Sequence, residues 1–212
     1  MQTLERPDVR PQPGRSQGPT AADVKIAELD NDSLIIRLHF TINHLSRWLT
    51  PVHDQTLLAR SPRRGEPSVK ELVIRLRDEE LRVFPKMHLI ATQVNPNLDK
   101  LPPVVRTPDQ SAKDEQRTTL GVMAEFRRLR QSTCSLLRAL PDAAWARVGT
   151  SRREHDWQIR GLAEYLANHD LDVLYEIDLA LDRNGAREGV SSAARAHLDE
   201  LLRLVPVSTR QP

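Results

Sequence analysis

Residues 68–90, which read SVKELVIRLRDEELRVFPKMHLI, show the pattern of an amphipathic helix. Ser68 is followed three residues later by Glu71, and this spacing is a capping box, a signal that opens many helices. The apolar residues behind it recur at helical spacing and form one stripe: Leu72, Leu76, Val83, Met87 and Ile90. Because Pro85 removes one helical hydrogen bond inside this stretch, we expect a kink or a restart there.

Other amphipathic segments flank this one. The expected helices cover, in chain order, residues 32–50, 68–95, 112–140 and 157–183, with a shorter one at 191–204. Asp32 or Ser33 would cap the first, and a long loop with three prolines, residues 97–111, precedes the third. The arginines of the third helix are expected mostly outside: Arg127, Arg128 and Arg130. The pattern predicts an all-α fold, an up-down four-helix bundle with a short extra C-terminal helix.

The chain is expected to hold one domain, because 212 residues suit a single domain with flexible ends. Residues 1–30 carry prolines, glycines and charges of both signs, and we expect a disordered tail there. Residues 31–205 should form the helical domain, and residues 206–212 a disordered C-terminus.

Charge and aromatic content argue against contact with nucleic acid. Lys and Arg total 31 and Asp and Glu total 29, so the net charge of +2 is close to zero. The paired arginines lie beside glutamates, whereas a nucleic-acid binder shows a basic face or stripe. Aromatic residues make up only 4% of the chain, too few for platforms on which bases stack. We therefore expect no nucleic-acid partner.

The length of the apolar runs and the single cysteine bear on where in the cell the protein is expected to be. Every apolar run is shorter than the roughly 18 residues that a membrane-spanning helix needs, so we expect no membrane partner. The single cysteine, Cys134, excludes an internal disulfide and fits a reducing environment. It is interpreted as a buried, inert thiol, since only arginines stand near it in sequence. The chain is predicted to be cytoplasmic.

Three short motifs, in order and at the right spacing, carry a family resemblance. They are Gly65 to Glu79, reading GEPSVKELVIRLRDE; Pro96-Asn97-Leu98; and Gly161 to Asp170, reading GLAEYLANHD. Over about residues 34–183 the chain thereby resembles the DinB/YfiT-like family. The resemblance implies a four-helix bundle that binds one divalent metal through three histidines, one on the second helix and two at i and i+4 on the last. Some members are thiol-dependent transferases or isomerases.

Carried over residue by residue, the implied metal site is incomplete. The histidine of the second helix corresponds to Arg75, and the i+4 partner of His169 corresponds to Val173. Only His169 stands where the family has a ligand. Pro67 also replaces the tryptophan usual before Ser68. A guanidinium is always protonated and would repel a metal ion, so the resemblance implies the scaffold without its usual metal centre.

The chemistry expected at this place centres on Arg75. We hypothesise that its fixed charge replaces that of the metal and pairs with Glu79 at i+4 or with a carboxylate of the fourth helix. The pocket candidates are Arg75, Glu79, His169 and Asp172. No cofactor is expected; zinc or nickel would need a non-standard site that uses His169 with carboxylates such as Glu176. His169 itself stays open between a core residue, a base and a lone ligand, and no catalytic residue is assigned.

Two classes of function follow from these expectations. The first is a non-catalytic bundle that binds a small molecule or a protein. The alternative is a thiol-dependent transferase or isomerase, or a metal-dependent hydrolase, of the kind that the resemblance implies. In the enzyme, an arginine in the pocket would suit an anionic substrate carboxylate.

The family resemblance also implies a homodimer formed through bundle helices. Leu201 and Leu204 of the last helix are expected to be exposed leucines that would support it. His39 and His44 of the first helix are interpreted as surface or boundary residues, because residues five apart do not share a helix face.

Overall fold

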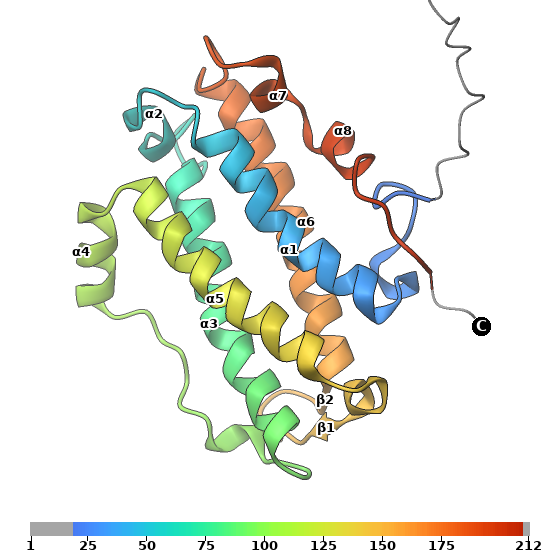
Figure 1. Ribbon diagram of the computed structural model, residues 1–212. Coiled ribbons are helices and arrows are strands. Elements are labelled where there is room, and N and C mark those ends of the chain that lie inside the picture. The colour runs from blue at the N-terminus through green and yellow to red at the C-terminus, as the bar shows by residue number, and fades with distance from the viewer. Residues whose placement is uncertain (1–18, 210–212) are drawn as a thin grey trace, which may run out of the picture.

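The computed structural model describes residues 19–209, and most of them lie in helices (Figure 1). Four long helices form a bundle: α1 (Asn31–Leu49), α3 (Val69–Thr92), α5 (Thr119–Ala139) and α6 (Ile159–Arg183). Both α5 and α6 pack against α3, and both also pack against α1. Helices α1 and α3 therefore occupy opposite corners, and the predicted all-α four-helix bundle is confirmed.

The direction of the helices differs from simple alternation. Near the start of α3, Arg77 donates to Glu125 near the start of α5, and further along Arg130 of α5 donates to Glu80 of α3. Helices α3 and α5 therefore run parallel, as Figure 1 also shows. The cause is the long connection over residues 93–118, which returns the chain along the outside of α3 to the end of the bundle where α3 began. The order is up, down, down, up.

The capping boxes behave as local chemistry predicts. At the start of α3 the backbone N–H of Glu71 donates to Ser68 Oγ at 3.2 Å, and the backbone N–H of Ser68 donates to the Glu71 carboxylate at 2.7 Å. Helix α3 continues through Pro85 to Thr92 without a restart. Helix α1 begins earlier than expected, because Asp30 rather than Asp32 or Ser33 accepts the capping hydrogen bond, from the N–H of Ser33 at 2.7 Å.

The expected third helix is two helices. Helix α4 (Pro108–Gln116) opens with a second capping box, between Thr107 and Gln110. Arg117 is extended, and Thr118 then caps α5 by accepting from the N–H of Gly121 at 3.1 Å. The prediction of one helix over 112–140 was wrong, since a second capping residue in mid-segment starts the helix anew.

Short elements complete the fold. The helix expected at 191–204 is α7 (Ser192–Arg195) followed by α8 (Leu198–Leu202). The remaining elements are α2 (Thr56–Ala59), the 3-10 turns Ile26–Glu28, Leu98–Lys100 and Asp142–Ala146, and the strands β1 (Val148–Gly149) and β2 (Trp157–Gln158). The two strands pair antiparallel, with Val148 opposite Gln158.

Parts of the two expected tails are ordered. Thr20 pairs with Pro206 and Leu29 pairs with Thr209, both antiparallel. Leu29 and Val207 are buried against the bundle. The structure thus places residues 19–30 and 206–209 in the folded unit, because their apolar side chains cover the open edge between α1 and α6. The rest of the predicted tails, residues 1–18 and 210–212, lies outside the described residues.

A buried ionic cluster joins all four long helices, and it overturns the outward placement of Arg130. That side chain is 0% exposed. It donates from Nε to Glu80 of α3 at 2.8 Å, to Asp170 of α6 and to the carbonyl of Leu38 on α1 at 3.0 Å. Thr41 of α1 donates to the same Asp170 at 2.7 Å. The bundle is therefore centred on charges as well as apolar side chains.

Two smaller expectations change with the packing. Leu201 is buried, so of the two leucines named for a dimer surface only Leu204, 67% exposed, remains on the outside. His44 is buried beside Phe40 and Trp48, and burial lowers the pKa of His44 to about 3. Cys134 is buried as expected, and burial raises the pKa of the Cys134 thiol to about 11.

None of the helices among residues 19–209 is long and apolar enough to cross a membrane.

Candidate functional site

Helices α3 and α6 run antiparallel, and they carry the residues of the expected pocket. Arg75 of α3 forms an ion pair with Glu176 of α6. Of the two partners expected for Arg75, the structure thus uses the carboxylate of the last bundle helix. Both side chains are 44% exposed, and an ion pair as exposed as this one contributes only about 0–1 kcal/mol.

Glu79, one turn after Arg75, has a partner of its own. Arg82 donates from Nε to both carboxylate oxygens of Glu79, at 3.1 and 3.2 Å. The same guanidinium donates to the hydroxyl of Tyr165 on α6 at 2.8 Å and lies over its ring. Burial and the Glu79 carboxylate raise the pKa of Tyr165. Arg82 and Tyr165 were not predicted, although Arg82 stands three residues after Glu79, a helical ion-pair spacing.

His169 stands half-buried on the same face of α6 as Tyr165, with the two rings stacked 6.4 Å apart. Burial lowers the pKa of His169, while the nearby carboxylates of Asp170 and Glu79 act in the opposite direction. Its Nδ1 is buried and, among the described residues, has no hydrogen-bond partner. The imidazole is therefore neutral at neutral pH and retains a nitrogen that is not engaged.

The remaining pocket candidate stands apart from these three. Asp172 is exposed on α6, whereas Val173, which stands where the family resemblance implies a second histidine on this helix, is fully buried. The structure thus brings together Arg75, Glu79 and His169, and leaves Asp172 on the outside.

The metal that the family resemblance implies does not fit these side chains. Arg75 brings a permanent positive charge to the position of the first ligand, and Val173 offers no donor atom. Glu79 is already bound by Arg82. Within residues 19–209, no three or more His, Cys, Asp or Glu side chains are grouped so that they could hold a metal ion. We therefore derive no step through a metal at this place.

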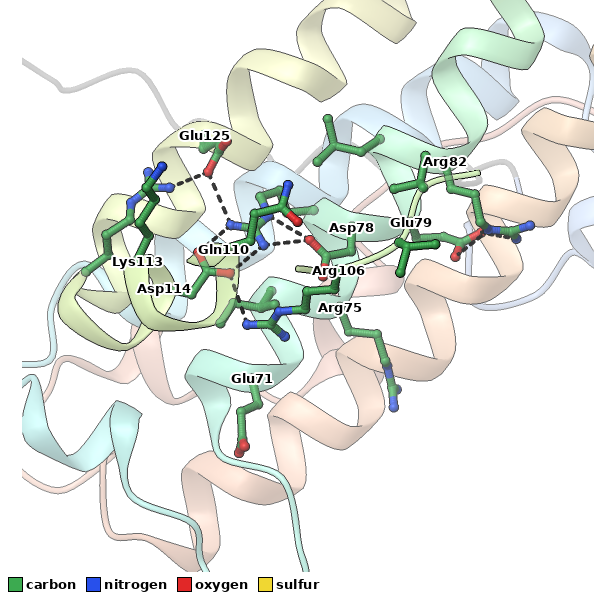
Figure 2. A pocket seen from close by; sticks show the side chains of 16 residues that line it. Glu71, Arg75, Asp78, Glu79, Arg82, Arg106, Gln110, Lys113, Asp114 and Glu125 are labelled. Carbon is green, nitrogen blue, oxygen red and sulfur yellow. Dashed lines mark hydrogen bonds and ion pairs between the residues drawn. The ribbon is translucent and has the colours of Figure 1, made fainter. Parts of the chain in front are cut away.

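A pocket of about 550 Å³ opens on the outer side of α3, under helix α4 and the segment that precedes it (Figure 2). Arg75, Glu79 and Arg82 line one part of it, and Arg106 and Asp114 another. Among the ion-paired side chains that line the pocket, Arg75 and Arg106 are the most exposed, at 44% and 41%. Glu71 and Lys113, which are also exposed, line the same pocket. An entering ligand would therefore meet these two charges together with the two guanidinium groups.

Helix α4 is held over this pocket by a buried ion pair. Arg77 of α3 donates to both carboxylate oxygens of Asp114, at 2.6 and 2.7 Å, and both side chains are largely buried. Arg106 adds a third hydrogen bond to Asp114 at 3.0 Å. A bidentate guanidinium–carboxylate pair is both strong and directional, so it fixes α4 against α3. This pair was not predicted from the sequence, because Arg77 and Asp114 lie in separate helices.

Replacing Asp114 by asparagine should make the free energy of unfolding less dependent on pH in the acidic range. Arg77 lowers the pKa of Asp114 in the folded protein. Its carboxylate therefore stabilises the fold above the unfolded pKa of about 4, and this contribution is lost as the pH falls through the lower folded value. The difference in the free energy of unfolding between the wild type and Asp114→Asn should be constant at neutral pH and shrink below about pH 4.

Urea denaturation of both proteins between neutral and acidic pH measures this difference. Glu115→Gln is the matched control, because it removes an exposed carboxylate from the same helix. If the difference in the free energy of unfolding between the wild type and Asp114→Asn stays constant down to acidic pH, the Asp114 carboxylate is not stabilised by Arg77.

Comparison with known proteins gives structural neighbours. YfiT from Bacillus subtilis, described as a probable metal-dependent hydrolase with an unusual four-helix bundle topology, superimposes with a TM-score of 0.59 at 19% identity, over 73% of this chain and 87% of that one. A mutant of a mycothiol-dependent maleylpyruvate isomerase superimposes with a TM-score of 0.51 at 12% identity, over 81% of this chain and 68% of that one. No family model and no curated protein matches the sequence.

These likenesses agree with the motifs at Gly65 to Glu79 and Gly161 to Asp170, which lie on α3 and α6 of the bundle. At identities this low they concern the fold. The chain has a DinB/YfiT-like four-helix fold, with an ion pair where the resemblance implies metal ligands.

Proposed function

We propose that this chain is a non-catalytic bundle that binds a small, multiply charged anion in the pocket between α3 and α4. The observation that carries the proposal is the ion pair between Arg75 and Glu176, which joins α3 to α6 where the family resemblance implies a metal centre. The positive charge that a metal ion would bring to this position is supplied by the guanidinium of Arg75. Catalysis that depends on a bound metal would accordingly be lost while the pocket remains.

The character of the ligand follows from the accessible charges. Arg75 and Arg106 are the most exposed of the ion-paired groups in the pocket, and guanidinium forks suit carboxylates and phosphates. The pairing of Arg75 with Glu176 is weak because it is exposed, so a ligand carboxylate can take the place of Glu176 at small cost. A dicarboxylate long enough to reach both guanidinium groups would bind better than a monocarboxylate.

Two measurements on the untagged protein test this proposal. Elemental mass spectrometry after dialysis against zinc and nickel should find far less than one ion per chain. Calorimetric titration with succinate should show binding, and Arg75→Gln and Arg106→Gln should each weaken it about tenfold, or about 1.4 kcal/mol. Arg128→Gln, on the exposed side of α5, is the matched control and should leave succinate binding unchanged.

The opposite results would favour the enzyme alternative. His169, with its lowered pKa and unengaged Nδ1, is the side chain that favours a base or a lone ligand. One tightly held ion per chain that disappears in His169→Ala would contradict the proposal and direct the search to hydrolase or thiol-dependent chemistry. Conversely, the double variant Arg75→His with Val173→His should acquire zinc if this place was inherited from a metal centre.

A further inference from the structure

A second pocket, of about 410 Å³, lies where the N-terminal segment crosses the bundle. Its walls come from residues 21–29 and from α1, α6 and α8, and it shares no residue with the pocket between α3 and α4. Most of its lining is apolar and includes Ala21, Val24, Ile26, Leu29, Leu171 and Leu202. This pocket would therefore accept the apolar part of a small molecule.

One charged side chain in its wall is unusual. Arg37 of α1 is 3% exposed, and both terminal nitrogens of its guanidinium are buried without a hydrogen-bond partner. A buried guanidinium whose terminal donors are unpaired destabilises the fold, because these N–H groups have lost their water and have gained no acceptor. Burial accordingly lowers the pKa of Arg37, with the nearby Asp170 acting against this.

The neighbouring acceptors are already engaged. The carboxylate of Asp170 accepts from Arg130 and from Thr41 at 2.7 Å. The Asp199 carboxylate at the pocket wall accepts from the Tyr175 hydroxyl at 2.8 Å. The charge of Arg37 is balanced at a distance by Asp170, but the terminal N–H groups of Arg37 have no acceptor among the described residues. An acceptor group on a bound molecule would satisfy these N–H groups.

We propose that this pocket binds a monocarboxylate with a short apolar body, whose carboxylate pairs with Arg37. A planar carboxylate matches the two terminal nitrogens of a guanidinium, and the apolar walls cover the rest of the molecule. A phosphate would leave an apolar wall uncovered, and a neutral alcohol would offer one acceptor oxygen and no negative charge to the guanidinium. The shape and the charge of the pocket therefore select for both parts of the ligand together.

Hexanoate is the probe that tests this proposal. Calorimetric titration with hexanoate, to about 10 mM, should show one site per chain, and the melting temperature should rise with its concentration. Hexanol should bind at least about tenfold more weakly, and inorganic phosphate should give no comparable shift. No binding of hexanoate, or equal binding of hexanol, would overturn the proposal.

Substitutions then assign the site. Arg37→Met should abolish hexanoate binding and, without ligand, melt at a higher temperature than the wild type, because an unpaired buried charge has been removed. Arg47→Met, an exposed arginine on the same helix, should bind as the wild type does. Ala27→Phe, which leaves Arg37 intact and fills the pocket from its exposed wall, should also abolish binding and decides the matter if Arg37→Met does not fold. Unchanged binding in either variant would overturn the proposal.

The two pockets are tested independently. Arg106→Gln should leave hexanoate binding unchanged, and Arg37→Met should leave succinate binding unchanged, because the pockets share no side chain. Either proposal can therefore fail while the other stands.

Discussion

Replacing Arg130 by leucine should lower the free energy of unfolding by about 3–5 kcal/mol. The substitution leaves the carboxylates of Glu80 and Asp170 facing each other in a fully buried place without the cation that bonds both. It also removes the hydrogen bond to the carbonyl of Leu38 and the contact of the guanidinium with the ring of Phe126. Helices α1, α3 and α6 would lose their common partner.

Urea denaturation followed by circular dichroism measures this effect. Arg128→Leu is the matched control, because it removes the same charge from the exposed side of α5 and should change stability by no more than about 0.5 kcal/mol. Adding Glu80→Leu and Asp170→Leu to Arg130→Leu should recover much of the loss, since an apolar cluster of similar volume often replaces a buried ionic one. A loss below about 1 kcal/mol for Arg130→Leu would show that water reaches this cluster.

Replacing Trp48 by alanine should cost about 3–5 kcal/mol. The indole lies fully buried at the end of α1, and its Nε1 donates to the carbonyl of Ala196 at 2.9 Å, in the connection between α7 and α8. The guanidinium of Arg187 lies over the same ring, 5.6 Å from its centre. Trp48 thus joins α1 to the C-terminal segment by shape, by a hydrogen bond and by a cation–π contact.

Trp48→Phe separates these contributions, because it keeps most of the apolar volume and removes the donor. We expect Trp48→Phe to lower the free energy of unfolding by only about 1–2 kcal/mol, which is the contribution of one hydrogen bond plus that of a small cavity. The midpoints of urea denaturation, at unchanged slope, measure both variants. Equal costs for the two variants would place the effect in the hydrogen bond alone.

Several features of the fold were readable in the sequence because they depend on neighbours in the chain. The capping box at Ser68 and Glu71 opens α3 as predicted, since both partners lie within one helical turn. The apolar stripes indicated four long helices for the same reason. At the site, Arg75 and Val173 were predicted to stand where the family resemblance implies two of the three metal ligands.

The buried ionic cluster has a signal in the sequence. Arg130 falls within the apolar stripe of its helix, four residues after Phe126 and four before Cys134. Glu80 and Asp170 interrupt the stripes of their own helices in the same way. A charged residue on the inner face of each of three helices predicts a buried ionic cluster. Arg130 was instead predicted to lie outside, together with Arg127 and Arg128.

The four long helices and most of their apolar faces could be predicted from the sequence. The pairing of Arg75 with Glu176, the attachment of α4 through Arg77 and Asp114, and the burial of Arg37 beside an apolar pocket could not. Helix formation and amphipathicity depend on residues within a few positions of one another, whereas the partner of a charge depends on which helices are adjacent and in which direction they run. That direction was set by the long connection over residues 93–118.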